Sequence, residues 1–146
     1  MPTYTVVTSN LDLNENKKKT LAEGITKIHS KTTGANTYFA QVIFNETKKN
    51  SHFMGGKIIN DEQIYLNGQI RAGRSKEVKD DLIDQLKKLL AKETNLDQSN
   101  VWVYIVDLEP SQMVEYGEVL PVSGQEKNWF ENLPEKLKKK LKSLES

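Results

Sequence analysis

The chain has 146 residues, of which 36% are hydrophobic and 28% charged, with a formal net charge of +1. These values are typical of one soluble globular domain and argue against a disordered chain. A dedicated nucleic-acid-binding protein would be more basic, and a chain without cysteine has neither disulfides nor thiolate chemistry. No apolar stretch approaches the roughly 20 residues of a membrane span, and the amino terminus lacks the basic region of a signal peptide. We therefore expect a cytoplasmic protein that binds neither nucleic acid nor membrane.

The first half of the chain predicts a strand, a helix and a second strand. Residues 4–8 are β-branched and aromatic, as in a strand, and Asp12 or Asn14 can cap a helix that follows. The helix ends at Gly34, and residues 38–44 are interpreted as a buried strand. The apolar face of the helix carries Leu21, Ala22, Ile25, Ile28 and His29.

The second half repeats this order. Residues 64–70 predict a strand, Ser75 can cap the next helix, and residues 101–106 predict the closing strand. The helix carries a wide apolar stripe formed by Val78, Leu82, Ile83, Leu86, Leu89 and Leu90. A segment with Gly55 and Gly56 joins the halves and can form a hairpin.

This pattern indicates an α/β (α+β) fold of two fused β-α-β units, residues 2–56 and 57–133, within a single domain over residues 1–146. Two such units can share one mixed four-stranded sheet with both helices on one face. The other face of the sheet would then be uncovered, which favours oligomerisation.

From Glu109 onward the chain is expected to be irregular. Trp129 and Phe130 are interpreted as anchors that dock this segment on the body or on a neighbouring subunit. Residues 134–146 are rich in lysine, and their leucine spacing predicts a short amphipathic helix on the solvated surface.

Pro2 is the first candidate for chemistry. If Met1 is removed, Pro2 carries a free secondary amine, and an α-amino group titrates near neutrality, with an unperturbed pKa of about 8. Such a group can exchange protons at working pH. In the alternative interpretation, Pro2 is only the first residue of a strand, where proline is tolerated.

Arg71 and Arg74 flank a glycine where a strand gives way to a helix, which favours an anion site because arginine forks match carboxylates. The alternative is that they pair with surface acids. His29 lies on or beside the apolar face of the first helix, where a lone histidine is more often a satisfied core residue than a functional one. The only other histidine, His52, has no evident partner, and two histidines without clustered acids do not have metal-site spacing. We therefore expect neither a metal nor a cofactor.

Two further residues complete the candidates. Tyr104 and Trp102 alternate along one strand and so share a sheet face, where an aromatic pair usually serves packing. Glu115 has apolar and aromatic neighbours, a setting that can raise the pKa of a carboxylate and suit it to acid–base work. A glutamate in a loop is otherwise simply solvated.

Together, these residues and their order resemble the tautomerase superfamily, whose members use an amino-terminal proline and a β-α-β building block. The sequence is most similar to the branch of cis-3-chloroacrylic acid dehalogenase, whose subunit fuses two blocks. The resemblance runs from Pro2 to about Leu133 and is dense at residues 58–75, 101–104 and 112–117. It implies a homotrimer that acts on a small carboxylate substrate.

The resemblance also implies roles in substrate binding. Arg71 and Arg74 match the pair that binds and polarises the substrate carboxylate, and His29 matches its helper. The chain departs from the dehalogenase at Asn67 and Gln69, where that enzyme carries histidines.

The remaining matches concern proton transfer. Pro2 matches the proline that protonates the α-carbon of the substrate. Tyr104 and Glu115 match the pair that positions and activates the water that attacks the β-carbon. A carboxylate near Pro2 favours its charged form and two arginines oppose it, so Pro2 can be an acid or a base.

Three functions therefore remain open. The favoured one is addition of water to an α,β-unsaturated carboxylate, with Pro2 as general acid and Glu115 as base. The second is keto-enol tautomerisation of a phenylenolpyruvate-type substrate, with Pro2 as base. The third is a non-catalytic trimeric scaffold or binding protein.

Overall fold

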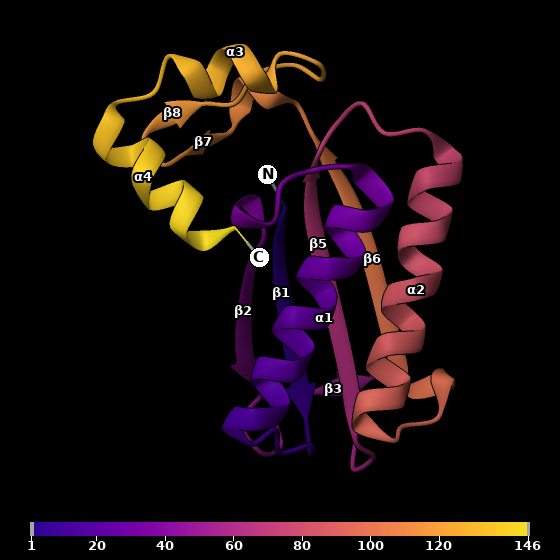
Figure 1. Cartoon of the computed structure of the whole chain (residues 1–146). Coiled ribbons are helices and arrows are strands. Elements are labelled where there is room, and N and C mark those ends of the chain that lie inside the picture. The colour runs from indigo at the N-terminus through magenta and orange to yellow at the C-terminus, as the bar shows by residue number, and fades with distance from the viewer. Residues whose placement is uncertain (1, 146) are drawn as a thin grey trace.

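The computed structural model describes residues 2–145 and consists of a four-stranded sheet with two long helices on one face (Figure 1). β1 pairs in parallel with β2 and antiparallel with β5, and β5 pairs in parallel with β6. The sheet has the order β2-β1-β5-β6, with strands β1 (Thr3–Ser9), β2 (Gln41–Glu46), β5 (Gln63–Arg71) and β6 (Val101–Leu108). Two β-α-β units in one mixed sheet confirm the expected fold class.

The first long helix begins at Asn14, one of the two caps that the sequence predicts, and the second at Ser75, as predicted. The Asn14 side chain accepts a hydrogen bond from the backbone N–H of Lys17 at the start of α1 (Glu15–Thr33). Ser75 caps α2 (Lys76–Thr94) in the same way. Each cap satisfies a backbone donor that the first turn of a helix leaves unpaired.

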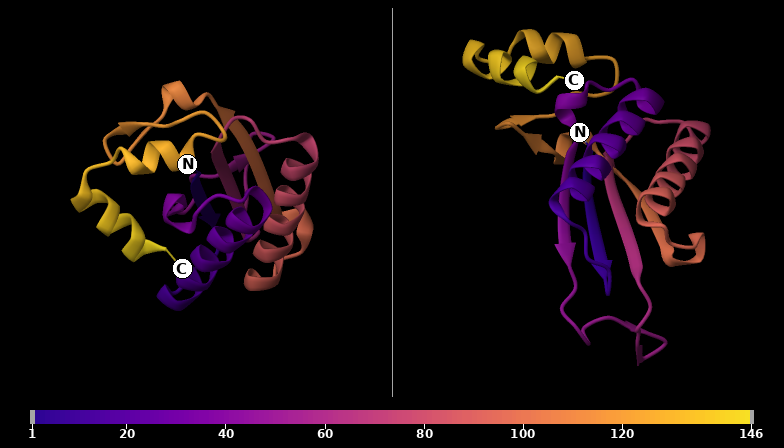
Figure 2. Two further views of the ribbon diagram at one scale, coloured as in Figure 1. Left: turned by 45° about the horizontal axis from the view of Figure 1, so that its top comes forward. Right: turned by 60° about the horizontal axis from the view of Figure 1, so that its bottom comes forward.

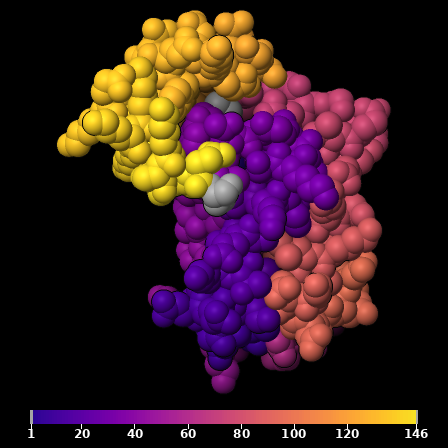
Figure 3. Space-filling model, in the orientation of Figure 1, coloured from indigo at the N-terminus to yellow at the C-terminus, as the bar shows by residue number. Residues whose placement is uncertain are grey.

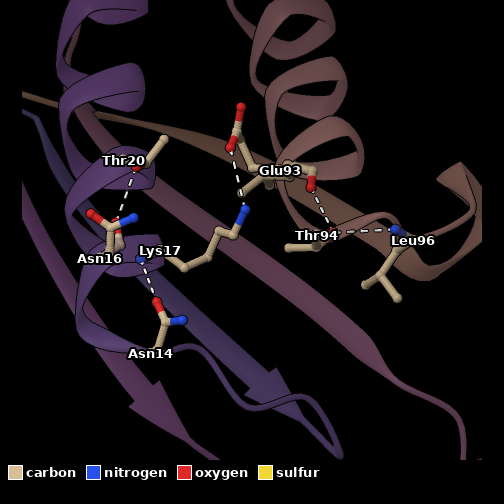
Figure 4. Close-up of polar contacts among 8 residues, drawn as sticks. Asn14, Asn16, Lys17, Thr20, Glu93, Thr94 and Leu96 are labelled. Atoms are coloured by element: carbon tan, nitrogen blue, oxygen red, sulfur yellow. Dashed lines mark hydrogen bonds and ion pairs between the residues drawn. The ribbon is translucent and has the colours of Figure 1, made fainter.

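The helices run in opposite directions, and an ion pair joins the start of α1 to the end of α2. Nζ of Lys17 lies 3.6 Å from a carboxylate oxygen of Glu93 (Figure 4). Glu93 is followed by Thr94, which closes the helix with a hydroxyl bond to the carbonyl of Leu90. These contacts lie at the end of the sheet away from the arginines.

The main core lies between the helices and the sheet. Leucine and isoleucine side chains from α1 and α2 pack on the face that β1 and β5 present, which is the burial that amphipathic helices predict. The side chains without exposed surface here are Tyr4, Val6, Leu21, Ile25, Ile64, Leu66, Leu82, Leu86 and Leu90.

The expected buried strand over residues 38–44 is wrong in extent and in burial. Tyr38 and Phe39 belong to a short 3₁₀ turn, η1 (Thr37–Phe39), and β2 starts only at Gln41. β2 lies at the edge of the sheet, so its side chains alternate between exposed and half-buried. Tyr38 and Phe39 are nevertheless buried, because they pack against the end of the chain.

The two halves are joined by a hairpin, as predicted. Its strands, β3 (Phe53–Met54) and β4 (Lys57–Ile58), pair around the two glycines and lie far from α3 and α4 (Figure 2). His52, for which no partner was evident in the sequence, lies beside this hairpin. Its Nδ1 is 2.7 Å from the Ser9 hydroxyl.

The end of the chain is not irregular. Residues 110–145, here called the C-terminal segment, form short regular elements that lie over one end of the sheet (Figure 1) and pack against the rest of the molecule there (Figure 3). The segment follows the turn η2 (Gln98–Asn100) and strand β6 in the chain. Its elements are η3 (Pro110–Gln112), β7 (Val114–Glu115), β8 (Glu118–Val119), α3 (Glu126–Glu131) and α4 (Glu135–Leu144).

A second core holds the C-terminal segment in place. The ring of Trp129 lies 5.7 Å from that of Phe39, and the ring of Phe130 lies 6.2 Å from that of Tyr38, between centroids. These contacts confirm that both aromatic residues anchor the segment on the body. Leu141 of α4 is fully buried in this second core, so α4 packs against the body and is not simply a solvated surface helix as expected from its sequence. Within residues 2–145, none of the helices combines the length and apolar character needed to cross a membrane.

Candidate active site

Pro2 lies at the amino-terminal end of β1 and is buried. Its carbonyl oxygen accepts a hydrogen bond from the backbone N–H of Gln41 at 3.0 Å. Thr3 pairs with Gln69 across the antiparallel strands β1 and β5, so Pro2 comes close to the level of Arg71, the last residue of β5. The register of the sheet therefore brings the amino-terminal residues and the arginine segment to the same end of the molecule.

His29 lies in the last turns of α1, above the same end of the sheet. It is buried, and its Nδ1 lies 2.7 Å from the hydroxyl of Tyr4. Burial, with the positive charge of Arg74 in addition, lowers the pKa of His29 to about 3. The imidazole is therefore neutral at pH 7. Burial raises the pKa of Tyr4, so its phenol keeps the proton that it can donate to Nδ1, which leaves the ring proton on Nε2.

The chain has 21 lysines and arginines, and its only arginines are Arg71 and Arg74. Both line one cavity of about 690 Å³ beneath the C-terminal segment. The Arg71 side chain is 1% exposed and Arg74 is half-buried. Burial, and then repulsion from Arg71, lower the pKa of Arg74. Two guanidinium groups in one partly closed cavity are suited to hold an anion, and a carboxylate matches their geometry.

Arg71 already has contacts in this cavity. One of its Nη groups donates to the carbonyl oxygen of Pro121 at 2.8 Å, and the other pairs with the carboxylate of Glu126 at the start of α3. Its Nε is buried and has no hydrogen-bond partner among the described residues. Sequence reasoning missed Glu126, because nothing in the linear pattern indicates that a residue 55 positions later reaches Arg71.

Glu115 lies in β7 and lines a second cavity of about 520 Å³. That cavity also includes Thr3, which follows Pro2 in the chain, and Gln41, whose backbone N–H donates to the carbonyl oxygen of Pro2. Phe39 lines both this cavity and the arginine cavity. The structure thus brings Glu115 to the same end of the sheet as Pro2 and the arginines, although in a neighbouring hollow.

Tyr104 does not reach this site within one chain. It lies in the middle of β6, with its side chain on the helix-free face, and is 51% exposed. Its ring meets that of Tyr65 edge-on at 5.1 Å. Leu108, the β6 residue level with Arg71, is four residues further along, which is roughly 13 Å in a strand.

The groups gathered at the end of the sheet indicate which chemistry they can support. Among residues 2–145, no cluster of three or more histidine, aspartate or glutamate side chains could hold a metal ion. What is present is a buried proline, a neutral imidazole, two guanidinium groups and carboxylates. These groups can bind an anionic substrate and transfer protons to it.

Comparisons with known proteins agree on the fold. A family model described as "Putative oxalocrotonate tautomerase enzyme" matches residues 1–133. No curated protein matches the sequence. The crystal structure of N1, a member of the cis-3-chloroacrylic acid dehalogenase family, is similar with a TM-score of 0.87 and 29% identity, over 95% of this chain and 99% of that chain.

Two other solved structures have lower TM-scores. Native Ps01740 has a TM-score of 0.73 and 31% identity, over 77% of this chain and 99% of its own. A fused 4-OT, a wild-type symmetric trimer, has a TM-score of 0.73 over 81% of this chain and 94% of its own. At 19% identity, this last likeness shows the fold alone.

Proposed function

The chain belongs to the oxalocrotonate tautomerase-type family of the tautomerase superfamily, and from that membership we propose that it adds water to an α,β-unsaturated carboxylate. The observation that carries the proposal is the convergence of Pro2, both arginines and Glu115 at one end of the sheet. The similarity to a member of the cis-3-chloroacrylic acid dehalogenase family supports the same chemistry.

The arginines would bind the substrate carboxylate in the cavity that they line. Their positive charge draws electron density toward the carboxylate, which leaves the β-carbon open to attack by water. His29, neutral and close enough for the charge of Arg74 to influence it, would help to orient the carboxylate by donating from Nε2.

The reaction then needs one base and one acid. Glu115 takes a proton from water as the oxygen bonds to the β-carbon, and the electrons of the double bond move toward the α-carbon and the carboxylate. The charged amine of Pro2 gives its proton to the α-carbon. With a 3-haloacrylate, the resulting halohydrin loses halide and a proton and leaves a 3-oxo acid.

The charge balance of the site supports Pro2 as the acid. A neighbouring positive charge disfavours a protonated amine, and a neighbouring carboxylate favours it. Because Glu126 pairs with Arg71, one of the two guanidinium charges is compensated within the protein. In the ligand-free protein this pairing reduces the repulsion that Pro2 would otherwise feel and favours its charged form at neutral pH, and a bound substrate carboxylate would compensate the same charge.

Tyr104 would enter the site from a second copy of the chain in a homotrimer. Its exposure on the helix-free face and its distance along β6 from the level of Arg71 support this assignment. The same face exposes further large apolar side chains, and a fused 4-OT with this fold is a symmetric trimer. The exposed side chains are Ile43, Trp102, Tyr104 and Val106.

The second candidate function is tautomerisation of an enol acid, which the family description supports. In that reaction Pro2 would be neutral and would act as the base, and Glu115 would be dispensable. The third candidate is a trimeric scaffold or binding protein without activity, in which Pro2 is only the start of a strand. A retained Met1 would favour it, because a blocked amine can neither accept nor deliver a proton. Met1 itself lies outside the described residues.

The test is turnover of cis-3-chloroacrylate and propiolate by wild type and by Pro2→Ala, Glu115→Gln and Glu118→Gln. Glu118 pairs with Glu115 across the hairpin and is exposed, so its variant is the matched control. We expect losses of 100-fold or more for Pro2→Ala and Glu115→Gln, the usual range for a lost general acid or base, and little change for Glu118→Gln. Equal rates in all four proteins would contradict the proposal. Intact mass establishes beforehand whether Met1 is removed.

A further inference from the structure

The Arg71 guanidinium is fixed and almost closed off from solvent. Its side chain is 1% exposed, and one Nη donates to the carbonyl oxygen of Pro121. A guanidinium group binds a carboxylate most favourably through two parallel N–H groups, and the Nε–Nη2 edge is one such fork. In this structure only one of the two N–H groups of this edge has a partner: Nη2 pairs with one oxygen of Glu126, while Nε is buried without a hydrogen-bond partner among the described residues.

Glu126 is the looser member of this pair. Its side chain is 39% exposed, so water can receive the carboxylate if it leaves Arg71. It stands at the start of α3, and the residues that anchor this helix on the body, Trp129 and Phe130, come later in it, so the Glu126 side chain can turn away while the helix stays in place. Gly124, two residues earlier, has a φ of 90°, which glycine adopts without strain. Arg71 is therefore held in place, while the side chain of Glu126 can turn toward solvent.

The pair also lies where a ligand would arrive. Glu126, Arg71 and Arg74 line the same cavity, and Arg74 is half-buried and reachable from it. A ligand carboxylate can thus meet Arg74 first. It cannot form a fork with Arg71 while Glu126 remains there, because the guanidinium group has almost no free surface.

We propose that the carboxylate of Glu126 occupies the position at Arg71 that a substrate carboxylate takes, so that the Glu126–Arg71 pair and ligand binding exclude each other. Glu126 acts as a built-in competitor that keeps Arg71 preorganised and lowers the apparent affinity for monocarboxylates. This role rests on the proposed function for its ligand class, a carboxylate bound by the two arginines. It assigns Glu126 as a residue that sets affinity, separate from the proton-transfer groups.

Two observations agree with a competitive role. Burial acts to raise the pKa of Glu126, but the hydrogen bonds from Arg71 and the backbone outweigh it, so the pKa lies below its ordinary value and the carboxylate is charged at pH 7. A charged carboxylate on Arg71 is the same chemical group that a substrate would present. The contact with Glu126 also stabilises the buried Arg71, because burying an unpaired positive charge would cost free energy.

The test uses the fact that the chain has only two arginines. In protein labelled with ¹⁵N-arginine, NMR detects two Nε–H signals, and Arg74→Lys leaves only that of Arg71. Acrylate is titrated into wild type and into two variants that weaken the pair. Glu126→Gln removes the negative charge, and Glu126→Asp keeps the charge on a shorter side chain. Glu131→Gln, on the exposed side of the same helix, is the control with equal charge change.

We expect both Glu126 variants to bind acrylate about tenfold more tightly. This is the change in affinity expected if Arg71 is free of Glu126 in about a tenth of the wild-type molecules and in nearly all molecules of the variants. The Arg71 Nε–H signal should move on binding, and Glu131→Gln should bind like wild type. Folded Glu126 variants that bind acrylate no more tightly than wild type would overturn the proposal, as would acrylate that shifts only the Arg74 signal. Since binding is measured without turnover, a protein that passes this test yet hydrates nothing would contradict only the proposed function.

Discussion

The hydroxyl of Tyr4 lies 2.7 Å from Nδ1 of His29, and this one contact joins β1 to the last turns of α1 next to the arginine cavity. The two rings also meet edge-on, with centroids 5.7 Å apart. Tyr4 can lie there because Gly68, on the neighbouring strand, has no side chain. A Cβ atom at Gly68 would be 2.5 Å from the Tyr4 ring. The position of His29 thus depends on a tyrosine and a glycine that take no part in the chemistry.

Tyr4→Phe should lower the free energy of unfolding by about 1–3 kcal/mol, because it leaves the buried Nδ1 of His29 without a partner. Urea denaturation measures the loss. In a His29→Leu background the same change should cost much less, since the acceptor is then gone. An equal cost in both backgrounds would mean that the hydrogen bond does not stabilise the fold.

Gly68→Ala should destabilise the protein by about 1–3 kcal/mol, because the new methyl group would overlap the Tyr4 ring and the Ile105 side chain in the core. Gly24→Ala is the informative comparison. Its methyl group would meet only the flexible end of Leu89, and alanine favours a helix over glycine by about 1 kcal/mol. Thermal melting of both variants should therefore show a clear loss for Gly68→Ala alone, and similar melting temperatures would be inconsistent with this packing.

Stability should fall on acidification because of His29. Burial lowers its pKa from 6.5 to about 3, so the unfolded chain binds a proton between these values and the folded chain does not. The contribution is fully present above pH 6.5 and is lost as the pH falls toward 3. Between pH 7 and pH 5 the loss is about 2 kcal/mol.

Urea denaturation at both pH values measures this loss, and His29→Leu provides the reference. In the variant, the difference between pH 7 and pH 5 should shrink by about that amount. A wild-type protein whose stability is the same at both pH values, or higher at pH 5, would show that His29 is not held neutral by burial.

The C-terminal helix should contribute to stability through Leu141. Leu141 is fully buried between α4 and the aromatic residues of η1, and leucine-to-alanine changes in a core cost about 2–5 kcal/mol. Leu144, on the same helix, is 50% exposed, and Leu144→Ala should cost less than 1 kcal/mol. Comparable losses in the two variants would indicate that α4 is not docked as described.

The part of the fold that could be predicted is the part that local signals specify. Asn14 and Ser75 cap the helices, and the glycine pair turns the hairpin, because caps and turns depend on a few adjacent residues. The apolar stripes of both helices were also evident, since a period of 3.6 residues reports directly on burial. Each of these features needs no knowledge of distant contacts.

What could not be predicted depends on contacts between distant parts of the chain. Phe39 lies in a 3₁₀ turn and is buried because Trp129, far along the chain, packs against it. The sequence around Phe39 is apolar but does not show this distant partner, and it was therefore interpreted as a buried strand. Glu126 reaches Arg71 only because β7, β8 and α3 fold back over the sheet. Pro2, the arginine pair and His29 were evident as candidates from their own sequence context, and the resemblance to a family supplied their roles. The placement of Pro2 and the arginines at one end of the sheet follows from the register of β1 and β5.

The central claim is that Pro2 is a proton donor, and the charge of its nitrogen tests that claim most directly. With ¹⁵N-proline labelling and Met1 shown by mass to be removed, the Pro2 amine can be followed by NMR as the pH is varied. The account predicts that Pro2 is protonated at pH 7 and that Glu115→Gln makes it easier to deprotonate, because a neighbouring carboxylate favours the charged amine. A Pro2 amine that is neutral at pH 7 in the wild type would contradict the account and would favour a tautomerase in which Pro2 is the base.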